Sequence, residues 1–103
     1  MRIGLQIGPE FRRYAEKVER LVADATTAEA TGFASVWVPQ IPGEFDALTA
    51  ITLMGQATER IELGTAVLPM QTRHPVAMAQ EILSNQAVCE GRFVPGLGPS
   101  HHW

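Results

Sequence analysis

The sequence is poor in cysteine, in long apolar runs and in basic charge. Its one cysteine, Cys89, has no partner for an intrachain disulfide, which is typical of a reducing compartment. No apolar run approaches the ~20 residues that span a bilayer, and the N-terminal residues lack the pattern of a signal peptide. Eight basic residues against eleven acidic ones leave no positive surface for nucleic acid. We therefore expect a cytoplasmic protein that binds neither a membrane nor a nucleic acid.

The chain also lacks the residue patterns of two common kinds of catalytic centre. Its three histidines, His74, His101 and His102, do not have zinc-site spacing, so we expect no metal. The carboxylate pair of a glycosidase is not evident either. What is present is an ordinary globular composition, 46% hydrophobic and 18% charged over 103 residues. This length predicts a single domain, residues 1–103.

Short apolar segments alternate with longer amphipathic ones along the chain. The apolar segments predict strands at residues 3–7, 33–38, 60–68 and 92–97, and the amphipathic ones predict helices that begin near Phe11, Asp46 and Pro75. The strands begin about 30 residues apart, which is the length of one strand–helix unit. Strands joined in this way must be parallel. The sequence therefore predicts an α/β fold.

The helical spacing also predicts which side chains face the core. In the first helix we expect Lys17 on the outer face with the other charged residues, and Gly32 at the C-terminal end. The expected inner positions of that helix are Phe11, Tyr14, Val18, Leu21, Val22, Ala25 and Ala28. Those of the third helix are Val76, Ala79, Ile82, Leu83 and Gln86. Cys89, late in the same pattern, is expected to be a small packing residue.

Periodicity alone leaves two architectures open. One is a doubly wound open sheet, and the other is a (β/α)₈ barrel, whose eight units take about 250 residues. A dinucleotide-binding sheet should carry a glycine fingerprint after its first strand, but the turn here is Gln6-Ile7-Gly8-Pro9-Glu10. The only Gly-x-Gly, at residues 96–98, lies at the far end of the chain.

Three segments carry a resemblance to a known family. Residues 58–67 read TERIELGTAV, residues 73–80 read RHPVAMAQ, and the run from Gly91 to His101 contains GRF and then GLGPSH. Together, in this order and spacing, they resemble the luciferase-like monooxygenase superfamily, and most of all its branch that uses the deazaflavin coenzyme F420. The weaker GFASVWV run at residues 32–38 extends the resemblance over essentially the whole chain. It implies the N-terminal half of a (β/α)₈ TIM barrel with parallel strands.

The resemblance also implies where a cofactor would bind, at the carboxyl ends of the strands. The implied cofactor-binding residues are Gln6, Gly8, Gln40, Thr65, Ala66, Val67, Gly98 and Ser100, and the implied catalytic residues are His101, as a proton donor, and Gln40. It further implies a bulge with a non-prolyl cis peptide, Ala66-Val67, against the cofactor ring. Gln40 stands where many relatives have histidine, and an amide cannot shuttle a proton near neutral pH.

Each of these positions also has a simpler interpretation. The residues from Thr65 to Val67 could be the end of a buried strand, Gln40 a polar loop residue, and His74 a loop or cap residue before Pro75. Ser100 and His101 could belong to a polar terminus. These alternatives remain open from the sequence.

The implied activity is that of an oxidoreductase that uses coenzyme F420, or alternatively FMN, to act on a small organic substrate by hydride transfer or monooxygenation. Four strands cannot close an eight-stranded barrel, so we expect the chain either to require the missing C-terminal half or to form a homo-oligomer. Two other hypotheses are a non-enzymatic, self-associating half-barrel and a flavodoxin-like FMN-binding domain. Pro95 is unexpected in the fourth strand, because proline cannot donate a ladder hydrogen bond.

Overall fold

The computed structural model describes residues 1–8 and 13–99, which form a four-stranded and a two-stranded parallel sheet, with three helices. The elements, in chain order, are β1 (Gly4–Gln6), α1 (Tyr14–Thr31), β2 (Ser35–Val38), α2 (Ala47–Ala57), β3 (Glu62–Thr65), β4 (Leu68–Pro69), a 3₁₀ turn (Met70–Thr72), α3 (Pro75–Val88), β5 (Phe93–Val94) and β6 (Leu97–Gly98). None of the helices described is long and apolar enough to cross a membrane.

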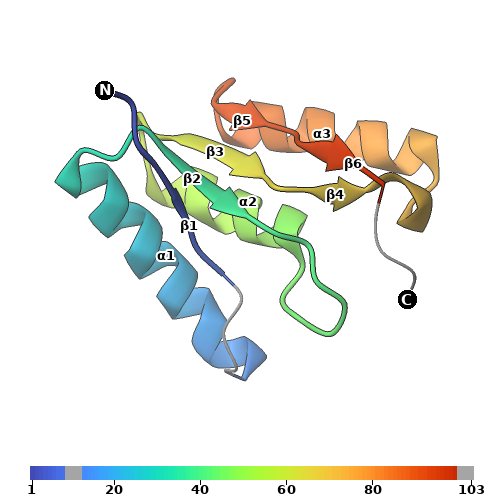
Figure 1. The fold of residues 1–103 in the computed structure, drawn as a ribbon, viewed down its shortest axis with the longest axis horizontal. Coiled ribbons are helices and arrows are strands. Elements are labelled where there is room, and N and C mark those ends of the chain that lie inside the picture. Colours follow the sequence, from blue (N-terminus) through green and yellow to red (C-terminus); the bar gives the residue numbers. More distant parts are fainter. Residues whose placement is uncertain (9–12, 100–103) are drawn as a thin grey trace.

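The order of the strands decides between the two architectures. Strands β1, β2, β3 and β5 are neighbours in chain order, and every pairing, including β4 with β6, is parallel. Helix α1 packs on α2 and α2 packs on α3, so the described helices form one layer along one face of the sheet (Figure 1). A doubly wound sheet has helices on both faces and a reversal of strand order. The observed arrangement is one arc of a barrel.

The helix ends agree with the sequence signals. The Asp46 carboxylate accepts a hydrogen bond from the Thr49 amide at 3.0 Å and caps α2. Pro75 occupies the first turn of α3, and His74 Nδ1 accepts a hydrogen bond from the Val76 amide at 3.1 Å. Gly32, with φ of 98°, ends α1 in the left-handed conformation that suits glycine. His74 is therefore a cap residue.

The third and fourth strands differ from the prediction, because each is interrupted. The segment expected as one strand over residues 60–68 is β3 and β4, separated at Ala66 and Val67, and the segment expected over 92–97 is β5 and β6, separated at Pro95 and Gly96. The interruptions lie beside each other, since the Leu68 amide donates to the Gly96 carbonyl at 2.7 Å. Pro95 thus lies between two strands and removes no ladder hydrogen bond.

The prediction for Lys17 was wrong. Its side chain is only 2% exposed and forms an ion pair with Glu44, which lies in the loop between β2 and α2. The same loop is held to α1 by Tyr14, whose hydroxyl donates to the Gly43 carbonyl at 2.8 Å. Tyr14 and Val18, expected inside, are 55% and 38% exposed. Helical periodicity within α1 carries no information about the loop between β2 and α2. This loop covers a part of α1 that the periodicity assigned to solvent.

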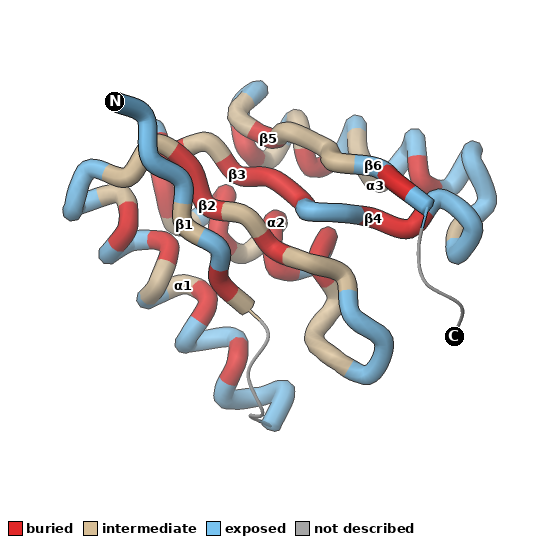
Figure 2. The backbone as a smooth tube through the Cα atoms, in the orientation of Figure 1, coloured by how far each residue is buried: buried red, intermediate tan, exposed pale blue. Residues whose placement is uncertain are grey.

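The inner face of α3 also differs from the prediction. In α3 and at its C-terminal cap the buried residues are Met78, Asn85 and Cys89, whereas Val76 and Leu83 are 69% and 70% exposed. Figure 2 accordingly shows most of α3 as exposed or intermediate. Cys89 is fully buried beside Gly55 of α2, as expected of a packing residue, and burial raises the pKa of its thiol. Helix α3 therefore uses a rotated face against α2 and leaves an apolar flank uncovered in the described structure.

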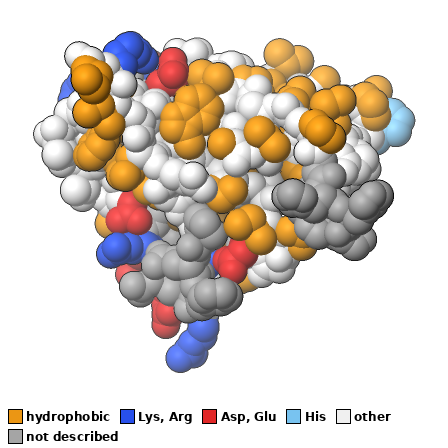
Figure 3. All heavy atoms as spheres, in the orientation of Figure 1, with side chains coloured by type: hydrophobic (Ala, Val, Ile, Leu, Met, Phe, Trp, Pro, Cys, Tyr) orange, Lys and Arg blue, Asp and Glu red, His pale blue; other side chains and the backbone are white. Residues whose placement is uncertain are grey.

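The main core lies between the sheet and the helix layer. It is formed by side chains that point away from the open face of the sheet, chiefly Leu21, Ala25, Val36, Val38, Leu48, Ile51, Met54, Leu63 and Phe93. The opposite, open face lies toward the viewer in Figure 1, and Figure 3 shows apolar side chains gathered over parts of it. Because all the strand pairs are parallel, the carboxyl ends of the strands lie at one edge of the molecule.

Candidate functional site

The carboxyl ends of the strands bring together most of the predicted site residues. The Ile7 amide donates to the Trp37 carbonyl at 2.9 Å just after β1, and the Ala66 amide donates to the Val38 carbonyl at 2.9 Å just after β3. The parallel pairing of β4 with β6 then places Gly98 opposite Pro69. The segments that carry Gln6, Gly8, Gln40, Thr65, Ala66, Val67 and Gly98 therefore share one edge of the sheet, as expected of parallel strands.

Ala66 and Val67 form an exposed step between β3 and β4. Both are solvent-exposed, Val67 by 41%, and the peptide bond between them is cis, as the resemblance implied. Gly98 lies directly beside this step, since a Cβ added to it would lie 3.2 Å from Val67 Cγ2. We call Ala66, Val67 and Gly98 the wall. Its side chains are small, so a flat ligand can approach the backbone closely.

Thr65 is not part of the wall. Its side chain is 1% exposed, and its hydroxyl donates to the Gly96 carbonyl at 3.1 Å and accepts from the Gly96 amide at 2.9 Å. Both hydrogen-bonding functions of the hydroxyl are thus used within the protein. In this structure Thr65 supports the wall from behind.

Gln6 and Gly8 lie at the end of β1. Gln6 is exposed on the open face of the sheet, where it pairs in register with Trp37. Gly8 has φ of 121°, and a Cβ there would lie 3.3 Å from Val38 Cγ1, so both conformation and space favour glycine.

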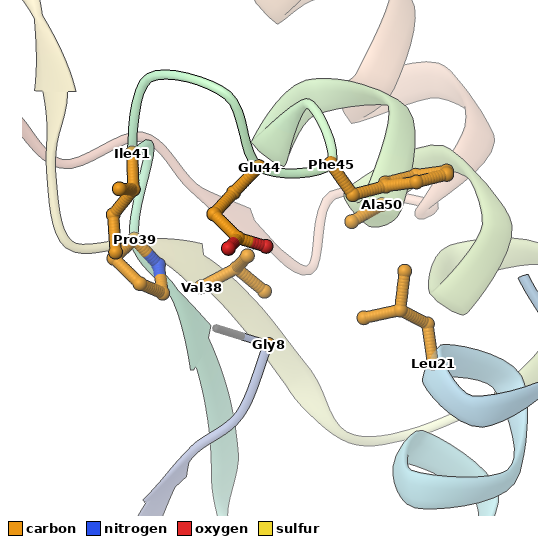
Figure 4. Close-up of a pocket in the computed structure, with 8 residues that line it drawn as sticks. All are labelled: Gly8, Leu21, Val38, Pro39, Ile41, Glu44, Phe45 and Ala50. Atoms are coloured by element: carbon orange, nitrogen blue, oxygen red, sulfur yellow. The ribbon is translucent and has the colours of Figure 1, made fainter. Parts of the chain in front are cut away.

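Gly8 also lines a small crevice beneath the loop between β2 and α2. Figure 4 shows its lining residues, Gly8, Leu21, Val38, Pro39, Ile41, Glu44, Phe45 and Ala50, with the Glu44 carboxylate pointing inward. Its volume of about 10 Å³ holds roughly one water molecule. The crevice is therefore too small for a cofactor ring or an organic substrate.

Gln40 is fixed by the N-terminal end of α2. Its Oε1 accepts from the Ala47 amide at 2.7 Å and its Nε2 donates to Asp46 Oδ1 at 3.2 Å. A glutamine amide has two donor hydrogens and two acceptor positions. One of each therefore remains for a ligand, from a side chain whose orientation is set in advance.

Asp46 and Arg73 form a charged pair that no sequence pattern marks as a site. Arg73 Nη2 donates to Asp46 Oδ1 at 2.5 Å, and its Nε lies 3.4 Å from Glu81. Burial by itself raises the pKa of Asp46, but the hydrogen bonds from Thr49 and the charge of Arg73 outweigh it, so the pKa lies below its ordinary value. Arg73 Nη1 is buried without a hydrogen-bond partner. Pairing of residues 46 and 73 depends on how α2 and α3 pack, which no local pattern shows.

Two predicted residues, Ser100 and His101, lie outside the described residues, as does His102. Among residues 1–8 and 13–99 no group of three or more histidine, cysteine, aspartate or glutamate side chains is arranged to hold a metal ion. The residues available for chemistry at the strand ends are thus mostly backbone groups and small side chains, with Gln6 and Gln40 as neutral polar groups.

Comparison with known proteins relates this geometry to a family. A family model described as luciferase-like monooxygenase matches residues 1–103. A Mycobacterium tuberculosis protein with the provisional name coenzyme F420-dependent oxidoreductase is 35% identical over 100 residues, which make up 97% of this chain and 28% of that protein.

Two solved structures have the same fold. The oxygenating constituent of 3,6-diketocamphane monooxygenase from Pseudomonas putida, solved in complex with FMN, superposes with a TM-score of 0.90 at 19% identity over 99% of this chain and 30% of its own. The coenzyme F420-dependent tetrahydromethanopterin reductase of Methanopyrus kandleri superposes with a TM-score of 0.79 at 26% identity over 97% and 27%. The chain therefore spans less than a third of each of these three proteins.

Proposed function

This chain belongs to the luciferase-like monooxygenase family, and from that premise we propose that it supplies the N-terminal half of the cofactor site of a barrel oxidoreductase. The proposed cofactor is coenzyme F420, with FMN as the alternative, and the proposed substrate is a small organic molecule. Two of the three proteins named above are an F420-dependent reductase and a monooxygenase solved with FMN. Because the chain spans under a third of those proteins, turnover is proposed only for the completed barrel.

The observation that carries the proposal is the wall at the carboxyl ends of β3 and β6, where Ala66 and Val67 are exposed and the buried Gly98 lies beside them. The wall fits a planar tricyclic ring because its side chains are small and apolar, and a larger one at Gly98 would meet Val67. When bound, the ring supplies the two-electron chemistry, and the protein contributes binding, orientation and exclusion of water.

The proposal gives a role to each predicted residue around the wall. Thr65 holds the wall in place through its two hydrogen bonds to Gly96. Gln40 offers its remaining amide hydrogen to a ring heteroatom or to the substrate, and Gln6 lies on the open face below. His101 remains the proposed proton donor, and Ser100 a proposed contact to the cofactor tail.

A binding experiment tests the proposal. FMN and purified F420 are titrated into this chain and into the full product of its reading frame, and ring absorbance and fluorescence are followed. We expect saturable binding that Val67→Asp weakens about tenfold or more, because a carboxylate would be desolvated against the ring.

The matched control is Val76→Asp, which places the same charge at another exposed valine, on α3. This variant should bind as the parent does. Binding of neither cofactor by either form of the protein contradicts the proposal. Equal binding by the Val67 and Val76 variants contradicts the assignment of the wall.

A further inference from the structure

The side chain of Trp37 lies across three strands on the open face of the sheet. A Cβ added at Gly64 of β3 would lie 2.9 Å from indole Cη2 and closer still to Cζ3 and Cε3, and one added at Gly4 of β1 would lie 3.0 Å from Nε1 and 3.2 Å from Cδ1. The six-membered ring therefore covers Gly64 and the pyrrole edge lies beside Gly4. The indole fits beside Gly4 and Gly64 only because these two residues have no side chains.

Neither glycine is required by its backbone. Positive φ is found at Gly8, Gly32, Gly43 and Gly91 of the described glycines, but not at Gly4 or Gly64. These two residues are the register partners of Ser35 and Trp37. The sheet thus clears space for one large ring on a face that no helix of the described structure covers.

The indole is also held in one orientation. Its Nε1 donates to Ser35 Oγ at 2.8 Å, and Ser35 is 7% exposed. The remaining side of the ring is partly open to solvent, since Trp37 has intermediate burial.

The position of Trp37 along the sheet relates it to the wall. Trp37 pairs with Gly64, and Ala66 lies two residues farther toward the carboxyl end of the same strand. At about 3.3 Å per residue, the indole lies roughly 7 Å below the wall. A flat ligand seated against Ala66 and Val67 would have this ring as the next surface beneath it.

We infer that Trp37 is a positioning residue, whose indole, set by Gly4, Gly64 and Ser35, is the floor on which a redox-active aromatic ring rests against the wall. The inference deepens the proposed function and depends on it. Contact with an electron-rich indole predicts a spectroscopic effect on the bound ring, because electron transfer from the indole quenches flavin fluorescence only at near-contact distance. If Trp37 only packed against the sheet and did not contact the cofactor ring, it would not quench the fluorescence of the ring.

The experiment uses the chain with Trp103→Phe, which leaves Trp37 as the only tryptophan of the two in the sequence. FMN and F420 are titrated, with binding measured from ring absorbance, and the emission and lifetime of the bound cofactor are recorded. The same is done with Trp37→Phe added. We expect bound FMN to be strongly quenched when Trp37 is present and several-fold brighter in its absence, with affinity about threefold to tenfold weaker.

A second variant guards against misfolding of Trp37→Phe, which far-ultraviolet circular dichroism would detect. Ser35→Ala removes the partner of the indole nitrogen while keeping the ring, and should partly relieve the quenching. Equal emission and equal affinity of the bound cofactor with and without Trp37 would overturn the inference while leaving the proposed function intact. Absence of cofactor binding in every variant would overturn both.

Discussion

Thr65 and Gly96 hold each other through two hydrogen bonds, one in each direction, at the point where both of their strands are interrupted. The Thr65 hydroxyl donates to the Gly96 carbonyl at 3.1 Å and accepts from the Gly96 amide at 2.9 Å. A Cβ at Gly96 would fall well inside contact distance of the Thr65 carbonyl. The pair replaces the ladder hydrogen bonds that a continuous strand would have made, and it sets the position of the wall.

Removing the Thr65 hydroxyl should therefore destabilise the fold. Thr65→Val keeps the shape of the side chain but leaves the Gly96 amide without its partner, and we expect a loss of about 1–3 kcal/mol in the free energy of unfolding. Urea denaturation measures it. Thr65→Ser, which keeps the hydroxyl, should lose less, and equal losses in the two variants would show that the hydrogen bonds contribute little.

Arg92 should be intolerant of replacement by lysine. Its guanidinium donates to the Cys89, Gly55, Thr58 and Ile61 carbonyls and to the Thr58 hydroxyl, at 2.8–3.0 Å. Several of these groups end α2, where cationic charge is favourable. A lysine ammonium cannot reproduce this planar set of donors, so Arg92→Lys should cost about 2–3 kcal/mol. Arg60→Lys, at a side chain that is 73% exposed, is the control and should be close to neutral in the same denaturation experiment.

The buried pair of Lys17 and Glu44 predicts strong coupling. Lys17→Met leaves the Glu44 carboxylate, 22% exposed, without its cation, and should destabilise by about 1–3 kcal/mol. The double variant with Glu44→Leu should recover much of that loss, because no unpaired charge remains. A double-mutant cycle from urea unfolding gives the coupling energy. A value near zero would contradict a functional ion pair at this position.

The lowered pKa of Asp46 predicts a loss of stability in acid. A carboxyl group whose pKa is lower in the folded state stabilises the protein above its unfolded pKa of about 3.9, and this stabilisation disappears as pH falls through the folded value. Asp46→Asn can still cap α2 but does not titrate. The free energy of unfolding, measured with urea at pH values from 6 to 3, should therefore fall less steeply with pH for Asp46→Asn than for the parent. Equal slopes for Asp46→Asn and the parent would contradict this contribution of Asp46.

The open edges of the sheet predict self-association of the isolated chain. In the described structure β1 and β5 are the two edge strands of the four-stranded sheet, and β6 is paired on one side only. Each of these strands therefore has an unpaired edge. Sedimentation should detect dimers or larger species at micromolar concentration. Ile3→Lys, at a 53% exposed residue just before β1, should reduce association, whereas Val18→Lys on α1 should not. A monomer at these concentrations would contradict the expectation that the isolated chain forms a homo-oligomer.

The helix ends were predictable because their signals are local. An aspartate at a helix start, a proline in the first turn and a glycine at the end act through atoms within a few residues, and Asp46, Pro75 and Gly32 all behave as expected. The wall was located for another reason. Its position followed from a resemblance in the residues around Thr65 to Val67, and no periodicity would have interrupted β3 there.

The faces of the helices were less predictable. Periodicity shows that a helix has an apolar side, but the neighbour that covers that side is set elsewhere in the chain. Lys17 is buried because Glu44 reaches it from a distant loop, and Leu83 is exposed because α2 packs on another flank of α3. For Gln40 and Trp37, too, periodicity could not show the partners of the side chain, because loop and sheet packing determine them.

The sequence by itself determined the alternation of strand and helix, the parallel sense of the strands and the ends of the helices, because each of these depends on the order and spacing of residues along the chain. Only the tertiary structure decided that the described helices form one layer, which makes the sheet an arc of a barrel, and that Thr65, Gly96 and Trp37 surround a common edge. Those arrangements depend on contacts between residues about 30 positions apart, whose free energy is gained only when several elements pack at once.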